Sequence, residues 1–205
     1  MRVAMLGGTF DPPHLGHLLL ANSAAAQFEL DRVLFVPAGD PYHRRPGSGF
    51  PAVSERAETS PSPDRLAMTR LAVAGNERFA VDGREVQRSG RTFTVDTLEE
   101  LAPELARSEG AGELFVLLGS DSVAEIGRWR SPQRIAELAT VLVAPRADGH
   151  PVPEWVRART VDMPRVDITS TSIRARLIAG RPVRYLVTDT VEAYIREHGL
   201  YTAAE

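Results

Sequence analysis

Two glycines and two histidines near the N-terminus form a pattern suited to binding a phosphate. Gly7 and Gly8 follow an apolar, strand-like run, and the stretch GGTFDPPHLGH leads into a helix-like run that begins near His14. Glycines let a ligand approach the backbone closely. His14 and His17 are three residues apart, so both lie on one face of the first helical turn, with Gly16 leaving room for a phosphate. Because a helix N-terminus also attracts anions, these residues predict a site that stabilises the growing negative charge of a reacting phosphate.

A second group of candidates lies near the C-terminus, in the stretch DITSTSIR. Ser170 and Thr171 supply hydroxyl groups at the start of a predicted helix, and Arg174 adds a guanidinium. Each stretch also has a simpler interpretation as an ordinary turn or helix cap. Two such stretches in one chain nevertheless favour a polyphosphate ligand that spans them.

Competing motifs do not match the sequence. The dinucleotide fingerprint G-x-G-x-x-G fails at Gly7-Gly8-Thr9, and the Walker loop requires a lysine, which the chain lacks. A zinc site at the histidine pair is weakly supported because no third ligand is evident. A hydrolase built on Ser120 and Asp121 is disfavoured because no motif places a histidine near them.

The composition is that of an ordinary globular protein. The 205 residues carry a net charge of −3, with 43% apolar and 25% charged residues, which gives no reason to expect nucleic acid or a membrane as a partner. The lack of cysteine excludes disulfides and thiolate metal sites. Polar residues interrupt the N-terminal apolar run, which argues against a signal peptide, and we expect a cytoplasmic protein.

Apolar runs alternate with helical patterns along most of the chain. Strands are predicted at 3–6, 32–36, 114–118 and 140–143, with a weaker one at 160–163 and short strands within 79–86. Helices are predicted at 15–28, from a cap at Asp64, and at 94–107, 132–138, 172–179 and 189–198, the last with a capping box of Asp189 and Glu192. This alternation indicates a doubly wound, Rossmann-like α/β fold, with helices on both faces of a parallel sheet and ligands at the carboxyl ends of its strands. We expect residues 1–205 to form a single domain, with a long flexible loop at about 38–63.

The two candidate stretches resemble known signatures. The opening stretch resembles the H-x-G-H signature of the nucleotidyltransferase superfamily, and Thr-Ser-Thr-x-x-Arg resembles its second signature. Within that superfamily the chain is similar to the bacterial nicotinate-nucleotide adenylyltransferases, of which the Phe-Asp-Pro-Pro-His spelling is typical. Further similar motifs follow in order at 36–44, 65–68, 88–98, 119–121, 129 and 185–201. The resemblance therefore covers nearly the whole chain.

This resemblance implies an adenylyl transfer in NAD biosynthesis. The 5′-phosphate of nicotinate mononucleotide would attack the α-phosphorus of ATP, releasing pyrophosphate and forming nicotinate adenine dinucleotide. His14, His17 and Arg174 would be the catalytic residues, and the Mg²⁺ cofactor would be held by the phosphates. The implied ATP-binding residues are Gly7, Gly8, Thr9, Phe10, His14, Gly16, His17, Gly119, Asp121, Ile168, Ser170, Thr171 and Arg174.

The resemblance also implies where the mononucleotide binds. The implied residues are Arg44, Thr92, Phe93, Thr94, Asp121 and Trp129. The segment from Thr92 to Thr94 would receive the nicotinate carboxylate, and Trp129 would stack on the pyridine ring. Three residues depart from the family pattern, because Arg44 replaces lysine, Phe93 replaces tyrosine and Ser172 replaces aspartate.

Other functions share parts of this pattern. A related adenylyl or cytidylyl transferase could use the same phosphate site for nicotinamide mononucleotide or phosphopantetheine. A sensor could bind ATP without turning it over. The sequence also leaves open whether the chain forms a homo-oligomer.

Overall fold

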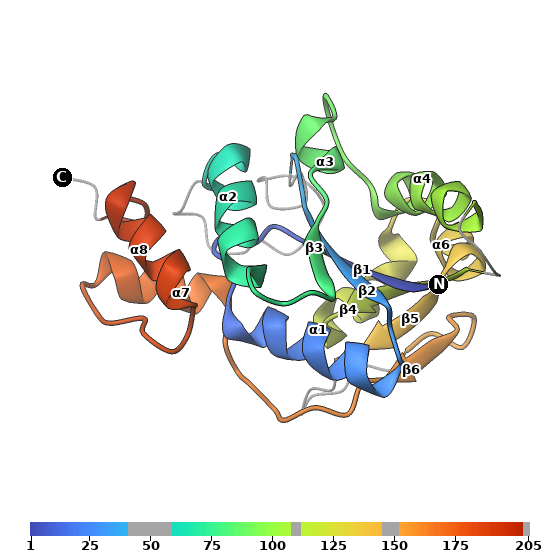
Figure 1. Ribbon diagram of the computed structural model, residues 1–205. Helices are drawn as coiled ribbons and strands as arrows, with labels where there is room; N and C mark the ends of the chain where they lie inside the picture. Colours follow the sequence, from blue (N-terminus) through green and yellow to red (C-terminus); the bar gives the residue numbers. More distant parts are fainter. Residues whose placement is uncertain (41–58, 108–111, 145–151, 203–205) are drawn as a thin grey trace.

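A six-stranded parallel sheet forms the centre of the structure (Figure 1). The computed structural model describes residues 1–40, 59–107, 112–144 and 152–202. The strands are β1 (Arg2–Gly8), β2 (Arg32–Pro37), β3 (Phe79–Val81), β4 (Glu113–Leu118), β5 (Thr140–Val143) and β6 (Ala158–Thr160). They lie in the order β3-β2-β1-β4-β5-β6, and neighbouring strands run parallel. This is the strand order of a doubly wound, Rossmann-like sheet, so the predicted fold class is confirmed.

Helices cover both faces of this sheet. They are α1 (Leu15–Gln27), α2 (Ser62–Val73), α3 (Arg84–Gln87), α4 (Thr94–Ala106), α5 (Ser120–Ala124), α6 (Pro132–Leu138), α7 (Ser170–Ile178) and α8 (Asp189–Glu197), with a 3-10 turn, η2 (Ile126–Arg128). In β1, Val3 and Met5 point into the core formed with α4 and α6, whereas Ala4 and Leu6 point into the core formed with α1. Because both faces are buried, the central strands are continuously apolar, and this made them recognisable in the sequence.

A third core joins α2 to the two C-terminal helices. Met68 of α2 packs in one cluster with Ile173 of α7 and Val191 of α8. In Figure 1 these three helices lie together at the end of the molecule that carries the C-terminus. The backbone N–H of Leu15 donates to the Leu186 carbonyl over 2.9 Å, so the C-terminal segment also contacts the start of α1.

The starts of three helices differ from the sequence prediction. α2 begins at Ser62, so Asp64 lies inside the first turn instead of capping the helix. α8 is capped by the Thr188 hydroxyl, which accepts a hydrogen bond from the backbone N–H of Val191, so the predicted capping box at Asp189 is wrong. α7 begins at Ser170, two residues earlier than predicted, because its cap is Thr169, whose hydroxyl accepts a hydrogen bond from the backbone N–H of Ser172.

Two predicted strands are also wrong in detail. The segment after β3 forms the helix α3 instead of a second strand, because the Asp82 carboxylate accepts hydrogen bonds from the backbone N–H and Nε of Arg84. The weak strand expected at 160–163 is displaced, because β6 spans Ala158–Thr160 and shares only residue 160 with it. The backbone N–H of Asp162 instead donates to the side chain of Gln27 over 2.7 Å. The predicted loop at about 38–63 overlaps the start of α2, and its residues 41–58 lie outside the described residues.

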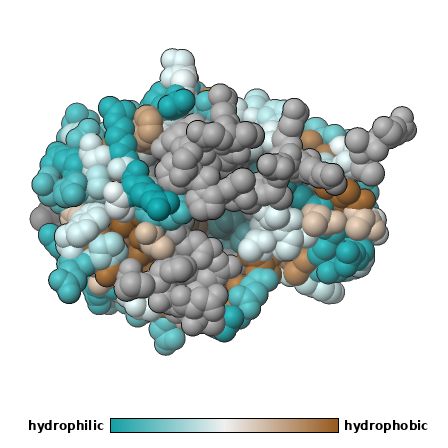
Figure 2. All heavy atoms as spheres, turned by 180° about the vertical axis from the view of Figure 1, so that it is seen from behind, coloured by the Kyte–Doolittle hydropathy of each residue, from teal (hydrophilic) through white to brown (hydrophobic). Residues whose placement is uncertain are grey.

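The face turned away from the view of Figure 1 carries hydrophobic residues interspersed with hydrophilic ones over its described part (Figure 2). Within the described ranges, no helix is long and apolar enough to cross a membrane.

Candidate active site

The loop after β1 begins the candidate site at the carboxyl end of the sheet. Its backbone turns at Phe10, which has a left-handed φ of 50° and is only 1% exposed. A Cβ at Gly8 would lie 3.2 Å from the Phe10 ring, so a glycine lets this ring fold back against the end of the strand. The Phe10 ring meets the His17 ring edge-on, with centroids 5.0 Å apart. Phe10 therefore supports His17 from the core and offers little surface to a ligand.

The two histidines of the motif lie directly against each other at the start of α1. Their rings stack with centroids 3.7 Å apart, and the backbone N–H of His14 donates to Nδ1 of His17 over 3.2 Å. Because Nδ1 of a neutral His17 accepts this bond, the ring proton is on Nε2, which can donate to a ligand. A Cβ at Gly16 would lie 3.0 Å from Nδ1 of His14, so the room that Gly16 leaves is taken by the His14 ring.

His14 is neutral at pH 7. The residue is 8% exposed, and burial lowers its pKa from 6.5 to about 4. Its Nδ1 is buried and has no hydrogen-bond partner among the described residues. A buried polar atom in this state destabilises the fold unless water or a ligand binds it. His14 therefore brings no positive charge to this loop at pH 7.

The second predicted anion site, at the start of α7, contacts the first. The Ser170 hydroxyl donates to the Pro12 carbonyl over 2.9 Å, and Nη1 of Arg174 donates to the Asp11 carbonyl over 2.7 Å. Nη2 of Arg174 also donates to the Thr171 hydroxyl over 3.3 Å. Arg174 is buried, and its Nε has no partner among the described residues. The structure therefore joins two stretches that are 163 positions apart at Asp11 and Arg174.

The serine at position 172 has a clear structural role. Its backbone N–H donates to the Thr169 hydroxyl over 3.0 Å, and its own hydroxyl accepts from the backbone N–H of Thr169 over 3.3 Å. This reciprocal pair is a capping box. Ser172 therefore closes the first turn of α7 without the negative charge that an aspartate would bring to this helix start.

Asp11 is a buried carboxylate that joins several segments at this loop. The Tyr201 hydroxyl donates to its Oδ1 over 2.6 Å, and the backbone N–H of Ser60 donates to its Oδ2 over 3.4 Å. Nη1 of Arg174 lies 3.8 Å from the same Oδ2. Burial and the nearby Asp11 charge raise the pKa of Tyr201, so its phenol remains a donor at physiological pH. The contact with Tyr201 could not be predicted, because nothing local in the sequence points to it.

The predicted mononucleotide segment forms the N-terminus of α4. Phe93 is the N-cap residue and Thr94 is the first residue of the helix, where backbone N–H groups favour an anion. The guanidinium of Arg130 lies over the Phe93 ring, 4.9 Å from its centroid, and its Nη1 donates to the Asp96 carboxylate in the first turn of α4 over 3.4 Å. Trp129 is partly buried and packs against the core beneath α4 and α6.

The Thr92 hydroxyl forms a hydrogen bond with the buried carboxyl group of Glu85. Glu85 accepts hydrogen bonds from the hydroxyls of Thr92 and Thr97, the latter over 2.7 Å. Burial raises the pKa of Glu85, and these hydrogen bonds and the charge of Arg88 oppose the shift. Thr92 therefore anchors the segment, and a carboxylate there would be bound by backbone groups.

Other predicted residues lie around the same edge or outside the described residues. Gly119 caps α5 directly after β4, and Asp121 lies on this helix, but its side chain is not among those described. Arg44 falls outside the described residues. The Ile168 carbonyl lies 3.8 Å from the Cβ position of Gly16, which places Ile168 beside the first turn of α1.

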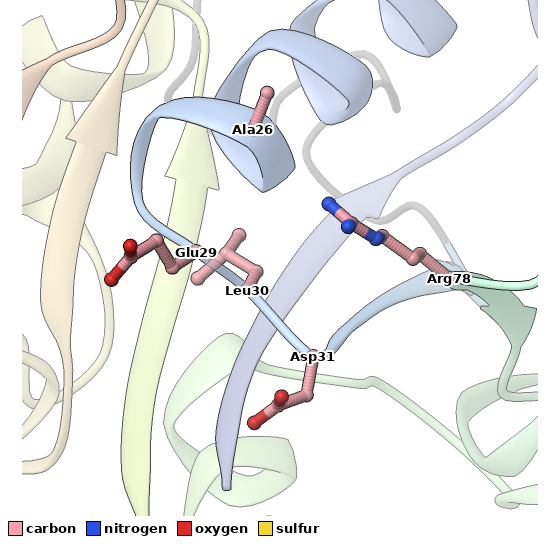
Figure 3. A pocket seen from close by; sticks show the side chains of 5 residues that line it. All are labelled: Ala26, Glu29, Leu30, Asp31 and Arg78. Carbon is pink, nitrogen blue, oxygen red and sulfur yellow. The ribbon is translucent and has the colours of Figure 1, made fainter.

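Two surface hollows lined by described residues lie elsewhere. One of about 390 Å³ is lined by Ala26, Glu29, Leu30, Asp31 and Arg78, at the amino end of β2 (Figure 3). Its charged side chains do not converge on one point in Figure 3. Another of about 260 Å³ lies beside Trp155 and α6. Because ligands of such sheets bind at the carboxyl ends of the strands, we assign neither hollow to the candidate site.

Comparisons with known proteins agree with this arrangement. Residues 5–176 match the cytidylyltransferase-like family. The chain is 43% identical over 202 residues to a probable nicotinate-nucleotide adenylyltransferase of Thermus thermophilus, covering 98% of this chain and 100% of that protein. It is 37% identical over 209 residues to a protein of the same description from a Synechococcus species, covering 98% of this chain and 96% of that protein.

A solved structure shares the fold. The nicotinic acid mononucleotide adenylyltransferase of Plasmodium falciparum, complexed with NaAD, superposes with a TM-score of 0.75 over 98% of this chain and 97% of that one. The two sequences are 14% identical, so this likeness concerns the fold alone.

Proposed function

The chain belongs to the nicotinate-nucleotide adenylyltransferase family, within the cytidylyltransferase-like proteins, and we infer that it joins ATP to nicotinate mononucleotide in NAD biosynthesis. An oxygen of the mononucleotide 5′-phosphate attacks the α-phosphorus of ATP. The bond between this phosphorus and the oxygen bridging to the β-phosphorus breaks, so that pyrophosphate leaves and nicotinate adenine dinucleotide forms. The observation that carries this inference is the junction of the α1 and α7 N-termini at one loop, because two adjacent helix N-termini suit a polyphosphate.

We propose that the two histidines stabilise the reacting phosphate. The hydrogen bond from the backbone of His14 fixes the tautomer of His17, whose Nε2–H would donate to the α-phosphate. His14, which is uncharged, would contribute a second hydrogen bond from its ring. Donors held ready for the charge that grows in the transition state lower the barrier without a protein nucleophile.

The start of α7 would hold the β- and γ-phosphates. Ser170 and Thr171 contribute the first backbone N–H groups of this helix, and Arg174 keeps the loop after β1 beside them. Gly7, Gly8, Thr9 and the region around Gly119 and Asp121 would complete the ATP site at the ends of β1 and β4.

The metal ion would arrive with ATP. Among the described residues, no group of three or more histidine or acidic side chains is placed to hold a metal, and the buried carboxylate of the loop after β1, Asp11, is bound by Tyr201 and Arg174. Such a site fits Mg²⁺ held by the substrate phosphates, where it would neutralise the charge of the leaving pyrophosphate. A cytoplasmic location is part of the same proposal, because the reaction consumes ATP.

The mononucleotide would bind between the end of β2 and the start of α4. Backbone N–H groups at Thr94 favour a carboxylate over a neutral amide, whereas the charge of Arg130 is already paired with Asp96. Trp129 would stack on the pyridine ring. Arg44 and Asp121 would bind the acceptor phosphate and a ribose hydroxyl.

An assay with each substrate left out in turn tests the proposed function. We expect pyrophosphate and the dinucleotide to form in equal amounts only when ATP, Mg²⁺ and nicotinate mononucleotide are all present. ATP binding without either product would instead identify a nucleotide sensor.

A further inference from the structure

Arg65 is a buried cation that the proposed reaction does not use. It is 1% exposed, and its guanidinium donates to three backbone carbonyls in three different segments. Nη1 donates to Thr9 over 2.8 Å, Nη2 to Gly39 over 3.0 Å and Nε to Ser60 over 2.9 Å. The planar fork of an arginine can span such carbonyls, whereas the single ammonium of a lysine cannot.

These bonds continue the pairing of β1 and β2 beyond the end of the sheet. The last backbone bond between the two strands runs from the N–H of Ala38 to the Gly8 carbonyl, over 2.8 Å. Beyond this bond, the Arg65 guanidinium bridges the carbonyls of Thr9 and Gly39, each one residue past the residue that forms the bond. Arg65 therefore sets the separation of the two loops at the point where the strands no longer hold them together.

The position of Arg65 is unfavourable for its own helix. It lies in the first turn of α2, where the helix dipole disfavours a positive charge, and it is fully buried. Burial of a charge is costly unless hydrogen bonds compensate it. The contacts of Arg65 with the loops therefore account for its presence better than helix stability does.

A second contact passes from Gly39 to the mononucleotide side. A Cβ at Gly39 would collide with the backbone carbonyl of Glu85, so the two backbones touch. The Glu85 side chain in turn binds the Thr92 hydroxyl, at the segment that leads into α4. A continuous path of contacts thus runs from Thr9 on the ATP side, through Arg65 and Gly39, to Thr92.

We propose that Arg65 is a positioning residue that fixes the ATP-binding loop relative to the mononucleotide-binding segment. This inference rests on the proposed function, since it concerns the alignment of the two substrates. In the proposed site, ATP contacts only the first of these segments and nicotinate mononucleotide only the second. Loss of the guanidinium bridge should therefore impair their reaction more than the binding of either one.

The test compares Arg65→Lys with wild type and with Arg70→Lys, a matched control at an exposed arginine of the same helix. Calorimetry measures the Kd of MgATP alone and of nicotinate mononucleotide alone, and initial rates give kcat. For Arg65→Lys we expect both Kd values to change by less than about 3-fold and kcat to fall by ~10²-fold, the size of effect that a misplacement of about 1 Å produces. Arg70→Lys should leave all three values unchanged.

Two results would overturn the inference. One is an unchanged kcat in a folded Arg65→Lys variant, and the other is a loss of binding as large as the loss of kcat, which would indicate a merely structural role. If thermal melting shows that Arg65→Lys does not fold, Gly39→Ala is used in its place, because it displaces the Gly39 carbonyl that Arg65 binds. This variant must then lower kcat much more than it changes either Kd. A wild-type enzyme that is inactive with the mononucleotide would contradict the proposed function instead, and the wild-type rates show this independently.

Discussion

The Tyr201 hydroxyl donates a 2.6 Å hydrogen bond to Oδ1 of Asp11, so a residue at the C-terminal end of the chain reaches into the loop between β1 and α1. Asp11 also binds Arg174 of α7, both through its carbonyl and through its carboxylate. The loop that leads to His14 is thus held by side chains from the far end of the sequence. A substitution at Tyr201 should therefore alter the position of the loop that leads to His14 at the candidate phosphate site.

We predict that Tyr201→Phe lowers both stability and turnover. The change keeps the ring but leaves Oδ1 of the buried Asp11 without its donor, which costs about 1–3 kcal/mol of unfolding free energy. Tyr194→Phe is a matched control, because Tyr194 donates to Asp64 over 2.8 Å away from the site. Urea unfolding and initial rates measure the two effects. Equal kcat values for the two variants would show that the Tyr201 bond does not position the phosphate loop.

His17→Ala should lower kcat by ~10²-fold or more, because it removes a donor to the charge that develops at the reacting phosphate. The Kd for ATP should change much less, since the ground state carries less of this charge. The exposed His198 supplies the control variant His198→Ala, which should keep the wild-type rate. Near-normal turnover of His17→Ala would exclude His17 from the mechanism.

Trp129→Ala should mainly raise the KM for nicotinate mononucleotide and leave that for ATP unchanged, because stacking affects only the acceptor. The partly exposed Trp155 lies beside the hollow at α6 and serves as the control. Steady-state kinetics with each substrate varied in turn measure the two constants. Equal increases in both would mean that Trp129 acts only through the core on which it packs.

The buried His14 makes stability depend on pH. Its folded pKa of about 4 lies below the ordinary value of 6.5, so as the pH falls from 6.5 toward 4 the unfolded chain takes up a proton that the folded chain does not. The free energy of unfolding should therefore decrease over this range, by at most about 3 kcal/mol. Glu85, whose pKa burial raises, acts in the opposite direction above its ordinary pKa of 4.5.

The difference between wild type and His14→Asn isolates this contribution, because Glu85 is common to both. Urea unfolding at several pH values between 4 and 7 measures it, and the difference in unfolding free energy should rise with pH. A difference that does not vary with pH would contradict the buried, neutral state of His14.

The strands and the position of the two candidate motifs at helix starts could be predicted because their signals are local. Continuous apolar runs at Val3 to Leu6 and Leu114 to Leu118 follow directly from burial on both faces. The histidine pair could be placed at a helix start from its spacing alone. That the two motifs lie close together could be expected from the rule that ligands bind where parallel strands end, at one edge of the sheet.

The supporting contacts could not be predicted in the same way. Arg65 and Tyr201 act on carbonyls and a carboxylate far away in the chain, and such contacts leave no periodicity in the sequence. Phe10 lies in the expected loop, but only its left-handed backbone reveals that its ring turns into the core. The predicted caps at Asp64 and Asp189 were wrong because α2 begins before Asp64, at Ser62, and α8 is capped by the adjacent Thr188.

Parallel initial-rate assays with nicotinate mononucleotide and its amide analogue test the central claim most directly. ATP and Mg²⁺ are held constant, and pyrophosphate release is measured for each acceptor. The backbone N–H groups at the N-terminus of α4 predict a strong preference for the acid in kcat/KM. Equal rates, or turnover with the amide alone, would contradict the carboxylate site and with it the proposed acceptor.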